Sequence, residues 1–214
     1  YKEALKLNSG PGYGVIEAQA LHGIIRYYSP KKIVEIGSGV STHCMLSAGA
    51  KNITCIEPYP SNFLKTNTSI KLIKKRLQDT DIKIFEDLSV GDFLFIDSTH
   101  TLKIGSDVSI IYLEIIPKLK PGVIIHIHDI YFPYNYSRSI NNTMFQYLET
   151  QMLQALLIDN QKIEILFCMS HLHYESSNDL KEIFPMYEPR KDIDGILINP
   201  DKGFFPSSIY LTTK

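Results

Sequence analysis

The chain has 214 residues, of which 44% are hydrophobic and 21% are charged, proportions typical of an ordinary globular domain. They exclude a disordered, collagen-like or coiled-coil protein. The 22 Lys and Arg residues balance 23 Asp and Glu residues, giving a formal net charge of -1. Since nucleic-acid binding leaves a basic excess in the sequence, we expect no nucleic-acid partner.

The cysteines and the apolar runs indicate in which cellular setting the protein works. Cys44, Cys55 and Cys168 are odd in number and widely spaced, which favours a reducing, cytoplasmic setting over a disulfide framework. The apolar run over residues 122–127 is strand-sized, far short of the roughly 20 residues that a membrane span needs. We therefore expect no membrane partner. The chain opens at Tyr1 rather than Met, so any segment upstream would be invisible.

Short apolar runs alternate with helical stretches along the chain. Apolar periodicity and stop signals predict helices over residues 14–28, 41–50, 106–116 and 144–158. Short apolar runs, several of them β-branched, predict strands over residues 33–36, 53–56, 71–75, 93–96, 123–127, 163–169 and 208–213. Strands that are apolar throughout and separated by helices indicate a parallel sheet covered on both faces. We therefore expect an α/β fold with a doubly wound, mostly parallel sheet of seven strands.

Polar and acidic side chains follow the first five predicted strands. In such sheets ligands bind outside the carboxyl ends of the strands, so these residues are the candidate site. They are residues 35–39, Glu57, Gln78 with Asp79, residues 97–100, and His128 with Asp129.

The turn after the first strand has half of a dinucleotide-binding fingerprint. Gly37-Ser-Gly39 permits close approach of a ligand to the backbone, and the helix that opens at Ser41 offers free N–H groups. Glu57 follows Gly37 by 20 residues, where an acid at the second strand end reaches ribose hydroxyls. The third glycine of the fingerprint is absent, and Thr42 stands in its place.

Two kinds of ligand use this arrangement: a nicotinamide or flavin dinucleotide, and S-adenosylmethionine. Glu35 favours the second, because a carboxylate before the glycines would repel a pyrophosphate but attract an ammonium and a sulfonium. A dinucleotide-dependent oxidoreductase on the same fold remains the first rival.

Four segments carry a resemblance to a known family. Val34-Glu-Ile-Gly-Ser-Gly-Val-Ser41 resembles the first motif of class I S-adenosylmethionine-dependent methyltransferases, and Leu119-Lys-Pro-Gly-Val123 resembles their turn before the fifth strand. Leu77-Gln-Asp79 and Phe95-Ile-Asp97 are similar to the branch with catechol and metal-dependent macrolide-sugar O-methyltransferases. The resemblance spans about residues 10–136.

The resemblance implies a Rossmann-like sheet whose last strand is antiparallel, and it implies where the cofactor binds. The glycine turn would line the methionine end, Glu57 would bind the ribose, and Gln78 with Asp79 would lie beside the adenine. The full expected cofactor set is Glu35, Gly37, Ser38, Gly39, Ser41, Glu57, Gln78, Asp79 and Asp97.

The resemblance also implies a divalent metal. Asp97 and Asp129 match two aspartates that hold magnesium in the catechol-type enzymes, but Ile130 replaces the Asn that follows the second. His128 stands where the sugar-methylating branch has an acid. We expect metal ligands at Asp97, His128 and Asp129, with magnesium as the ion, or manganese, iron or zinc where His128 binds. His126, deeper on the same strand, is interpreted as structural.

His100 matches the general-base His of the sugar-methylating branch. A hydroxyl is a poor nucleophile until its proton leaves, and an imidazole suits that transfer near neutral pH. We therefore expect His100 to be catalytic. The alternative is that His100 is a fourth metal ligand beside Asp97, His128 and Asp129.

The expected activity is methyl transfer to a hydroxyl of a sugar or small-molecule acceptor. Tyr131, Tyr134 and Tyr136 are candidate walls of the acceptor pocket, and the His171-Leu-His173 pair is interpreted as a loop feature. The rivals are a metal-independent methyltransferase, a non-catalytic cofactor-binding module and a hydroxylase-like metal enzyme. The oligomeric state, including a homo-oligomer, stays open.

We expect one methyltransferase domain over residues 1–214. Its parts are a helical cap at 1–30, a cofactor-binding core at 31–170 and an insertion at 171–207 before the last strand.

Overall fold

The computed structural model describes residues 2–6, 13–134, 148–189 and 204–214. Tyr136 and the first residues of the helix expected over 144–158 lie outside these ranges. In the described part of the chain, no helix combines the length and the apolar character that crossing a membrane requires.

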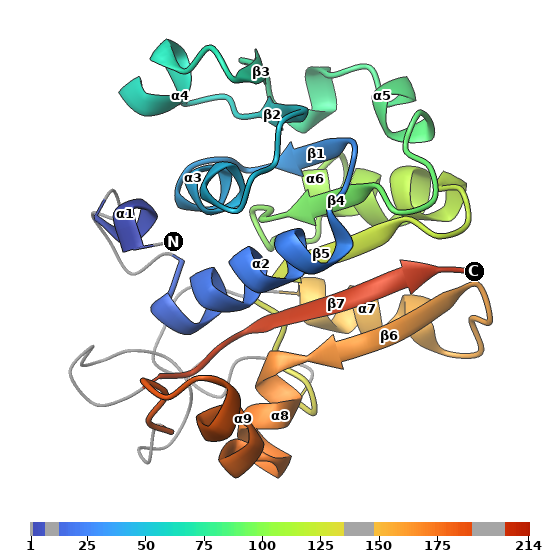
Figure 1. Cartoon of the computed structure of the whole chain (residues 1–214). Coiled ribbons are helices and arrows are strands. Elements are labelled where there is room, and N and C mark those ends of the chain that lie inside the picture. Colours follow the sequence, from blue (N-terminus) through green and yellow to red (C-terminus); the bar gives the residue numbers. More distant parts are fainter. Residues whose placement is uncertain (1, 7–12, 135–147, 190–203) are drawn as a thin grey trace.

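One seven-stranded sheet forms the centre of the described structure, in the order β3-β2-β1-β4-β5-β7-β6 (Figure 1). The first five strands pair in parallel, and β7 runs antiparallel to both β5 and β6. This confirms the expected doubly wound sheet with an antiparallel last strand. The strands are β1 (Ile33–Ile36), β2 (Ile53–Ile56), β3 (Ile70–Ile73), β4 (Phe93–Ile96), β5 (Ile124–His128), β6 (Ile163–Cys168) and β7 (Ser208–Thr213).

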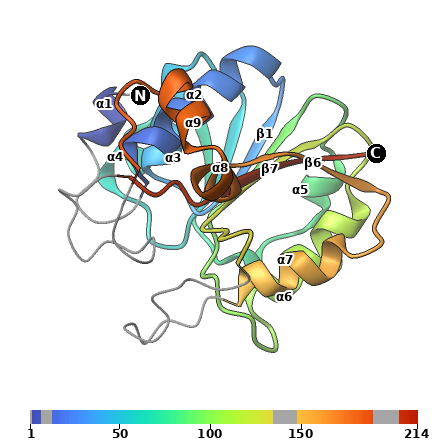
Figure 2. The same cartoon turned by 90° about the horizontal axis from the view of Figure 1, so that it is seen from below.

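Helices cover both faces of the sheet (Figure 2). One face carries α2 (Val15–Tyr28), α3 (Val40–Ser47), α8 (Met169–Glu175) and α9 (Ser177–Ile183), and the other carries α5 (Lys83–Glu86), α6 (Asp107–Ile110) and α7 (Glu149–Leu157). Shorter elements are α1 (Lys2–Leu5), α4 (Asn62–Thr66), η1 (Leu77–Asp79), η2 (Ile111–Ile115) and η3 (Ile116–Lys118).

The predicted boundaries shift for local reasons. The helix expected over 41–50 ends at Ser47, because Gly49 takes a left-handed φ of 99°. The strand expected over 71–75 becomes Ile70–Ile73, in register with β2, and so ends where β2 ends. The helix expected over 106–116 is capped by Ser106, as predicted, but tightens into η3 at Pro117, which has no N–H to donate.

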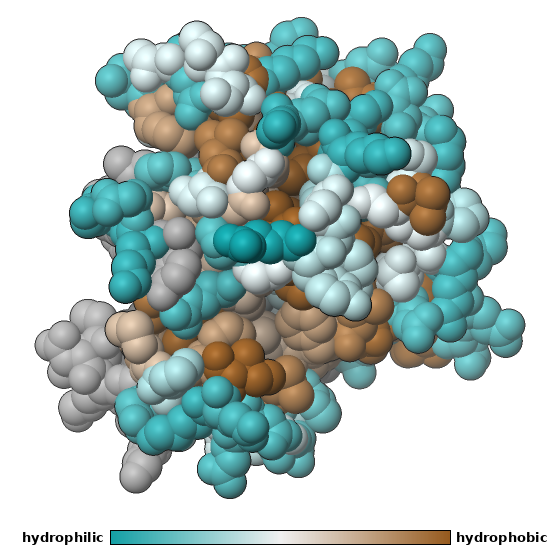
Figure 3. All heavy atoms as spheres, in the orientation of Figure 1, coloured by the Kyte–Doolittle hydropathy of each residue, from teal (hydrophilic) through white to brown (hydrophobic). Residues whose placement is uncertain are grey.

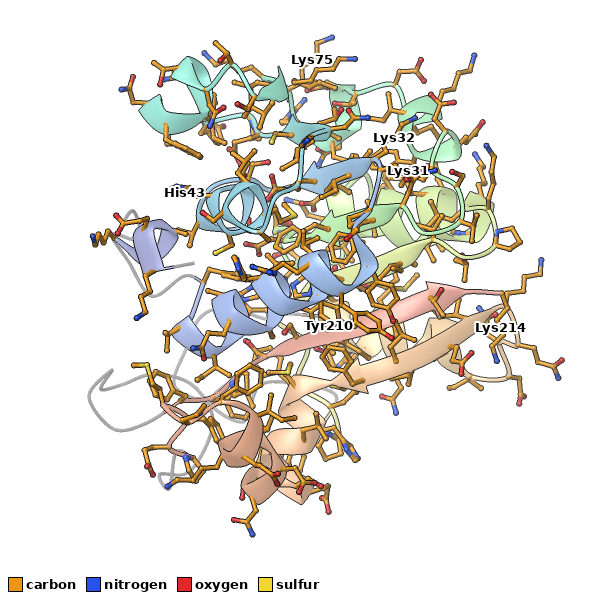
Figure 4. All side chains as sticks on the ribbon, in the orientation of Figure 1. Lys31, Lys32, His43, Lys75, Tyr210 and Lys214 are labelled. Carbon is orange, nitrogen blue, oxygen red and sulfur yellow. The ribbon has the colours of Figure 1, made fainter. Side chains whose placement is uncertain are left out.

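Two apolar clusters pack on the two faces of the sheet. Alternate side chains of each strand point to opposite faces, so Phe93 and Phe95 pack beneath α2 and α3, while Leu94 and Ile96 pack against α6 and α7. All four are 0% exposed. Tyr210 on β7 lies beneath α2 in the first cluster (Figure 4). On the face in Figure 3, hydrophilic side chains cover the outer elements, with smaller apolar areas between them.

The parallel strands place their carboxyl ends along one edge of the sheet. The loops after β1, β2, β4 and β5 therefore meet there, bringing together residues from four separate parts of the sequence.

Candidate active site

The turn after β1 requires glycine at its first position. Gly37 has a φ of 72°, and a Cβ there would collide with the carbonyl oxygen of Asp97 at the end of β4. A side chain at this position would therefore push apart the two strand ends that frame the site.

Thr42, which stands where the fingerprint has its third glycine, makes two hydrogen bonds within the turn. Its hydroxyl accepts the Gly39 N–H at 3.0 Å and donates to the Glu35 carboxylate at 2.6 Å. Ser41 donates to the other oxygen of Glu35, also at 2.6 Å. These bonds tie the end of β1 to the first turn of α3.

Glu35 itself is 0% exposed. Burial raises the pKa of Glu35 to about 7, although the hydroxyls of Ser41 and Thr42 and the thiol of Cys55 oppose the shift. Through the hydrogen bonds from Ser41 and Thr42, this side chain fixes the first turn of α3. Its direct contact with a ligand stays a prediction.

Glu57, at the end of β2, joins the glycine turn from the neighbouring strand. It accepts the N–H of Ser38 at 3.3 Å and the N–H of Tyr59 at 2.7 Å. The turn after β1 and the end of β2 are therefore held together by one carboxylate.

The expected adenine residues lie on the surface. Gln78 and Asp79 are exposed on η1, and Arg76 donates to Asp79 at 2.8 Å. The hydrogen bond and charge of Arg76 hold the pKa of Asp79 below its usual value. Both side chains follow β3, one strand beyond Glu57.

Side chains from the ends of β4 and β5 converge on one point. Asp97 Oδ1 lies 3.4 Å from His100 Nε2 and 3.4 Å from His128 Nδ1. Asp129 is within reach of the same two nitrogens, at 3.5 Å from His100 Nε2 and 3.7 Å from His128 Nδ1. The imidazoles are buried, while the side chains of Asp97 and Asp129 are 37% and 24% exposed. The cluster is therefore accessible from its carboxylate side.

Two buried acids that the sequence analysis did not single out hold the far sides of these imidazoles. Glu149, the first residue of α7, lies 2.7 Å from His100 Nδ1. Glu17 on α2 lies 3.2 Å from His128 Nε2 and also accepts the N–H of Ser207 at 3.0 Å. Each ring thus has a buried carboxylate behind it and the two aspartates in front.

The charges around the rings dominate their protonation. Burial opposes a charged imidazole, but the carboxylates around His100 and His128 outweigh it and raise the pKa of both well above the ordinary value. Burial also opposes ionisation of Asp97, and the two imidazoles outweigh that effect, so the pKa of Asp97 falls well below its usual range.

These donors fit a metal ion. One ligand atom each from Asp97, His100 and His128 lies within 4.8 Å of the others. The Nδ1 of His128 is buried without a hydrogen-bond partner among the described residues. This is expected of a nitrogen whose lone pair binds a cation. Asp129, with a left-handed φ of 54°, is fixed beside them by Ser207, whose hydroxyl donates at 2.7 Å.

His126 differs from His128, although both point to the same face of β5. It is 0% exposed and stacks on Phe95 at 4.6 Å between ring centroids, with Tyr210 edge-on at 4.5 Å. Neither ring nitrogen has a hydrogen-bond partner among the described residues. This packing supports the interpretation of His126 as structural.

Aromatic side chains surround the chain after Asp129. Tyr134 packs edge-on against Tyr174 of α8 at 5.0 Å, and Tyr131 stacks with Phe205 at 6.2 Å. His171 and His173 lie on α8, so their interpretation as a loop feature is wrong. His173 contacts the hydroxyl of Tyr187 at 2.7 Å.

Comparisons with known proteins agree with this geometry. Residues 34–130 match a family model described as a methyltransferase domain. A curated protein of Archaeoglobus fulgidus, described as an uncharacterized protein, is 36% identical over 83 residues, which cover 34% of this chain and 38% of that protein. The chain thus spans well under two thirds of that relative.

Two solved structures share the fold over nearly the whole chain. An O-methyltransferase from Bacillus cereus in complex with SAH is 16% identical with a TM-score of 0.57, covering 100% of this chain and 90% of that one. The O-methyltransferase TomG from Streptomyces achromogenes, in complex with SAM, is 12% identical with a TM-score of 0.54, covering 95% and 83%.

At these identities the two structures show the fold alone. The family model adds that residues 34–130, on the doubly wound sheet, are similar to a methyltransferase domain. Both findings agree with the class that the motifs predict, a class I, S-adenosylmethionine-dependent methyltransferase.

Proposed function

We propose that this enzyme methylates a hydroxyl of a sugar or small-molecule acceptor, with His100 as general base and a divalent ion as assistant. One observation carries the proposal: His100 is held at Nδ1 by Glu149 and presents Nε2 toward both Asp97 and Asp129. An imidazole placed this way is suited to accept a proton at the carboxyl ends of β4 and β5. The bound SAH and SAM of the two structural neighbours support the choice of cofactor.

The residues at β1 and β2 fit S-adenosylmethionine. Gly37 lets the backbone approach a ligand closely, and Glu57 ends β2 where an acid can accept from ribose hydroxyls. We propose that Glu35, Ser38, Gly39, Ser41, Gln78, Asp79 and Asp97 complete the set, with Glu35 acting through the hydroxyls that it holds. When bound, the cofactor supplies an electrophilic methyl group on a sulfonium.

The residues at β4 and β5 fit a divalent ion. Asp97, His128 and Asp129 would hold it, and the buried Nδ1 of His128, which faces both aspartates without a hydrogen bond among the described residues, supports this assignment. When bound, the ion supplies positive charge that lowers the pKa of the acceptor hydroxyl and offsets the aspartates beside His100. That offset matters, because His100 must be neutral to act as a base.

His100 then completes the proton balance. Its Nε2 takes the hydroxyl proton as the oxygen–carbon bond forms and the carbon–sulfur bond breaks, so the sulfonium charge reappears on the imidazole. Glu149 stabilises that imidazolium from behind, and the proton later leaves to solvent.

We also propose the parts of the chain that surround this chemistry. The segment 171–207 would be an insertion that contributes to acceptor choice, since α8 brings Tyr174 against Tyr134. A reducing, cytoplasmic setting is supported by the three buried thiols.

Calorimetry tests the cofactor directly. We expect wild-type protein to bind SAH and S-adenosylmethionine and not NAD. Binding of NAD without SAH would contradict the proposal and favour the oxidoreductase rival.

Methyl transfer to a panel of catechols and free sugars tests the reaction and its metal. A chelator should abolish transfer and a divalent ion should restore it, whereas Asp129→Ala should stay inactive at ordinary metal concentrations. Asp179→Ala, an exposed acid on α9, is the matched control. Full transfer in excess chelator, with no metal in elemental analysis, would leave a metal-independent methyltransferase. Binding of SAH without transfer to any of the panel would favour a non-catalytic module.

A further inference from the structure

We propose that Glu149 is the positioning residue of the general base, fixing the ring orientation and tautomer of His100. The inference rests on the proposed function, in which His100 accepts the acceptor's proton at Nε2. Glu149 lies 49 residues away in the sequence, on a helix of the opposite layer from α2, and no motif points to it.

The contacts form a closed ring of hydrogen bonds. The Oε2 of Glu149 lies 2.7 Å from His100 Nδ1 and accepts the Ser98 hydroxyl at 2.6 Å. That hydroxyl in turn accepts the backbone N–H of His100 at 2.8 Å. One carboxylate oxygen therefore fixes both the side chain and, through Ser98, the backbone of the same residue.

The proton positions follow from this ring. The Ser98 hydroxyl accepts from His100 and so gives its own proton to Glu149. An ionised carboxylate only accepts, so the Nδ1 of His100 must also donate to it. The lone pair of a neutral His100 is then left on Nε2, the nitrogen that faces Asp97 and Asp129.

Two features indicate that this arrangement is built for function. Glu149 is 0% exposed and is the first residue of α7, where the helix N-terminus stabilises a negative charge. His100 has a left-handed φ of 56°, a costly conformation for a residue with a side chain. Thr99 helps to hold it, because its N–H and hydroxyl both donate to Asp107, at 2.8 and 2.7 Å.

The experiment reads the His100 ring itself and needs no acceptor. The spectra are recorded at a pH above the raised pKa of His100, where the ring is neutral. In wild-type protein labelled with 15N histidine, long-range proton–nitrogen spectra should then show His100 protonated at Nδ1 and not at Nε2, with the signal assigned through His100→Gln. Glu149→Ala should lose this signature and show a mixture of tautomers. Glu149→Gln should retain it, because the amide oxygen still accepts from Nδ1.

Further variants separate positioning from stability. Leu153→Ala, a buried residue of α7 in the apolar core, should leave the His100 signature unchanged. Glu149→Asp keeps the charge but is one methylene too short to reach Nδ1, and it carries the test if Glu149→Ala does not fold. With an acceptor from the panel, Glu149→Ala should lower kcat about 10²-fold and leave SAH affinity unchanged.

The outcomes distinguish this inference from the proposed function. An unchanged His100 signature in the folded Glu149→Ala or Glu149→Asp protein overturns the positioning role, as does full kcat in either variant. Wild-type protein that binds no SAH overturns the proposed function instead.

Discussion

The cofactor half and the reacting half of this site are built in different ways. At the ends of β1 and β2, the key contacts join residues 6, 7 and 19 positions apart, and the last of these uses a backbone N–H group. Around the ends of β4 and β5, the contacts join residues 49, 111 and 190 positions apart, and each is made to a buried glutamate side chain. The first half is a local turn, and the second is assembled by the fold.

This difference has a functional consequence. A turn held by near neighbours keeps its shape whenever β1 and α3 are formed, so cofactor binding should be robust. The reacting half depends on α2, α7 and the chain before β7 all being docked, because Glu17, Glu149 and Ser207 come from them. Substitutions that disturb the docking of these elements should therefore lower methyl transfer more than they lower cofactor affinity.

The largest expected effect tests that separation. His100→Ala should lower turnover by about 10²–10⁴-fold, the usual range for a positioned acid or base. SAH affinity should stay nearly unchanged, because His100 lies outside the β1–β2 turn. The measurements are SAH production with the best acceptor of the panel and calorimetry with SAH.

Two outcomes would change the assignment. Full turnover in His100→Ala would make His100 a loop residue only. Loss of bound metal in elemental analysis would make it a fourth ligand, as its place 3.4 Å from Asp97 also allows.

The second effect concerns the pH dependence of stability in the cofactor half. The pKa of Glu35 is about 7 in the folded protein against an ordinary 4.5, so the folded state binds this proton more tightly than the unfolded state. Its contribution to stability is fully present below pH 4.5 and is lost as the pH rises through 7. Over this range the free energy of unfolding should fall by about 3 kcal/mol more in wild type than in Glu35→Gln.

Denaturant titrations at several pH values measure this difference. Glu114→Gln, at an exposed position of η2, should keep the wild-type pH dependence. Parallel pH profiles for wild type and Glu35→Gln would show that Glu35 has the same pKa in the folded and unfolded states, and so would contradict the raised value.

The third effect tests the end of β2. Glu57→Ala should weaken SAH binding by about 1.5–3 kcal/mol, the range for hydrogen bonds to a charged group. Glu57→Gln still accepts one of the two N–H groups from Ser38 and Tyr59, so it separates the charge from the shape of the turn. Glu86→Ala, exposed on α5, is the control. Unchanged SAH affinity in a folded Glu57→Ala protein would remove Glu57 from the site.

The same contrast explains what the sequence could predict. Local sequence patterns predict the strands, the polar residues at their carboxyl ends and the glycine turn. The structure has all of them. Glu17 and Glu149 could not be found in this way. Each sits in the first turn of a helix, where an acid is common for local reasons, and only the packing of α2 and α7 brings it to a histidine.

The smallest expected effect tests whether His126 belongs to the charged cluster formed by Asp97, His100, His128 and Asp129. His126 and His128 lie on one face of β5, yet His126 packs between Phe95 and Tyr210 without a hydrogen bond from either ring nitrogen among the described residues. Burial lowers the pKa of His126 well below its ordinary value, so the ring is a neutral aromatic group. His126→Phe is close to a volume-conserving change and should alter the free energy of unfolding by less than about 1.5 kcal/mol. His128→Phe should cost more, because the buried Glu17 carboxylate loses its imidazole partner and keeps only backbone N–H groups. Denaturant titration of the two variants gives the comparison, and an equal or larger loss in His126→Phe would place His126 inside the charged cluster.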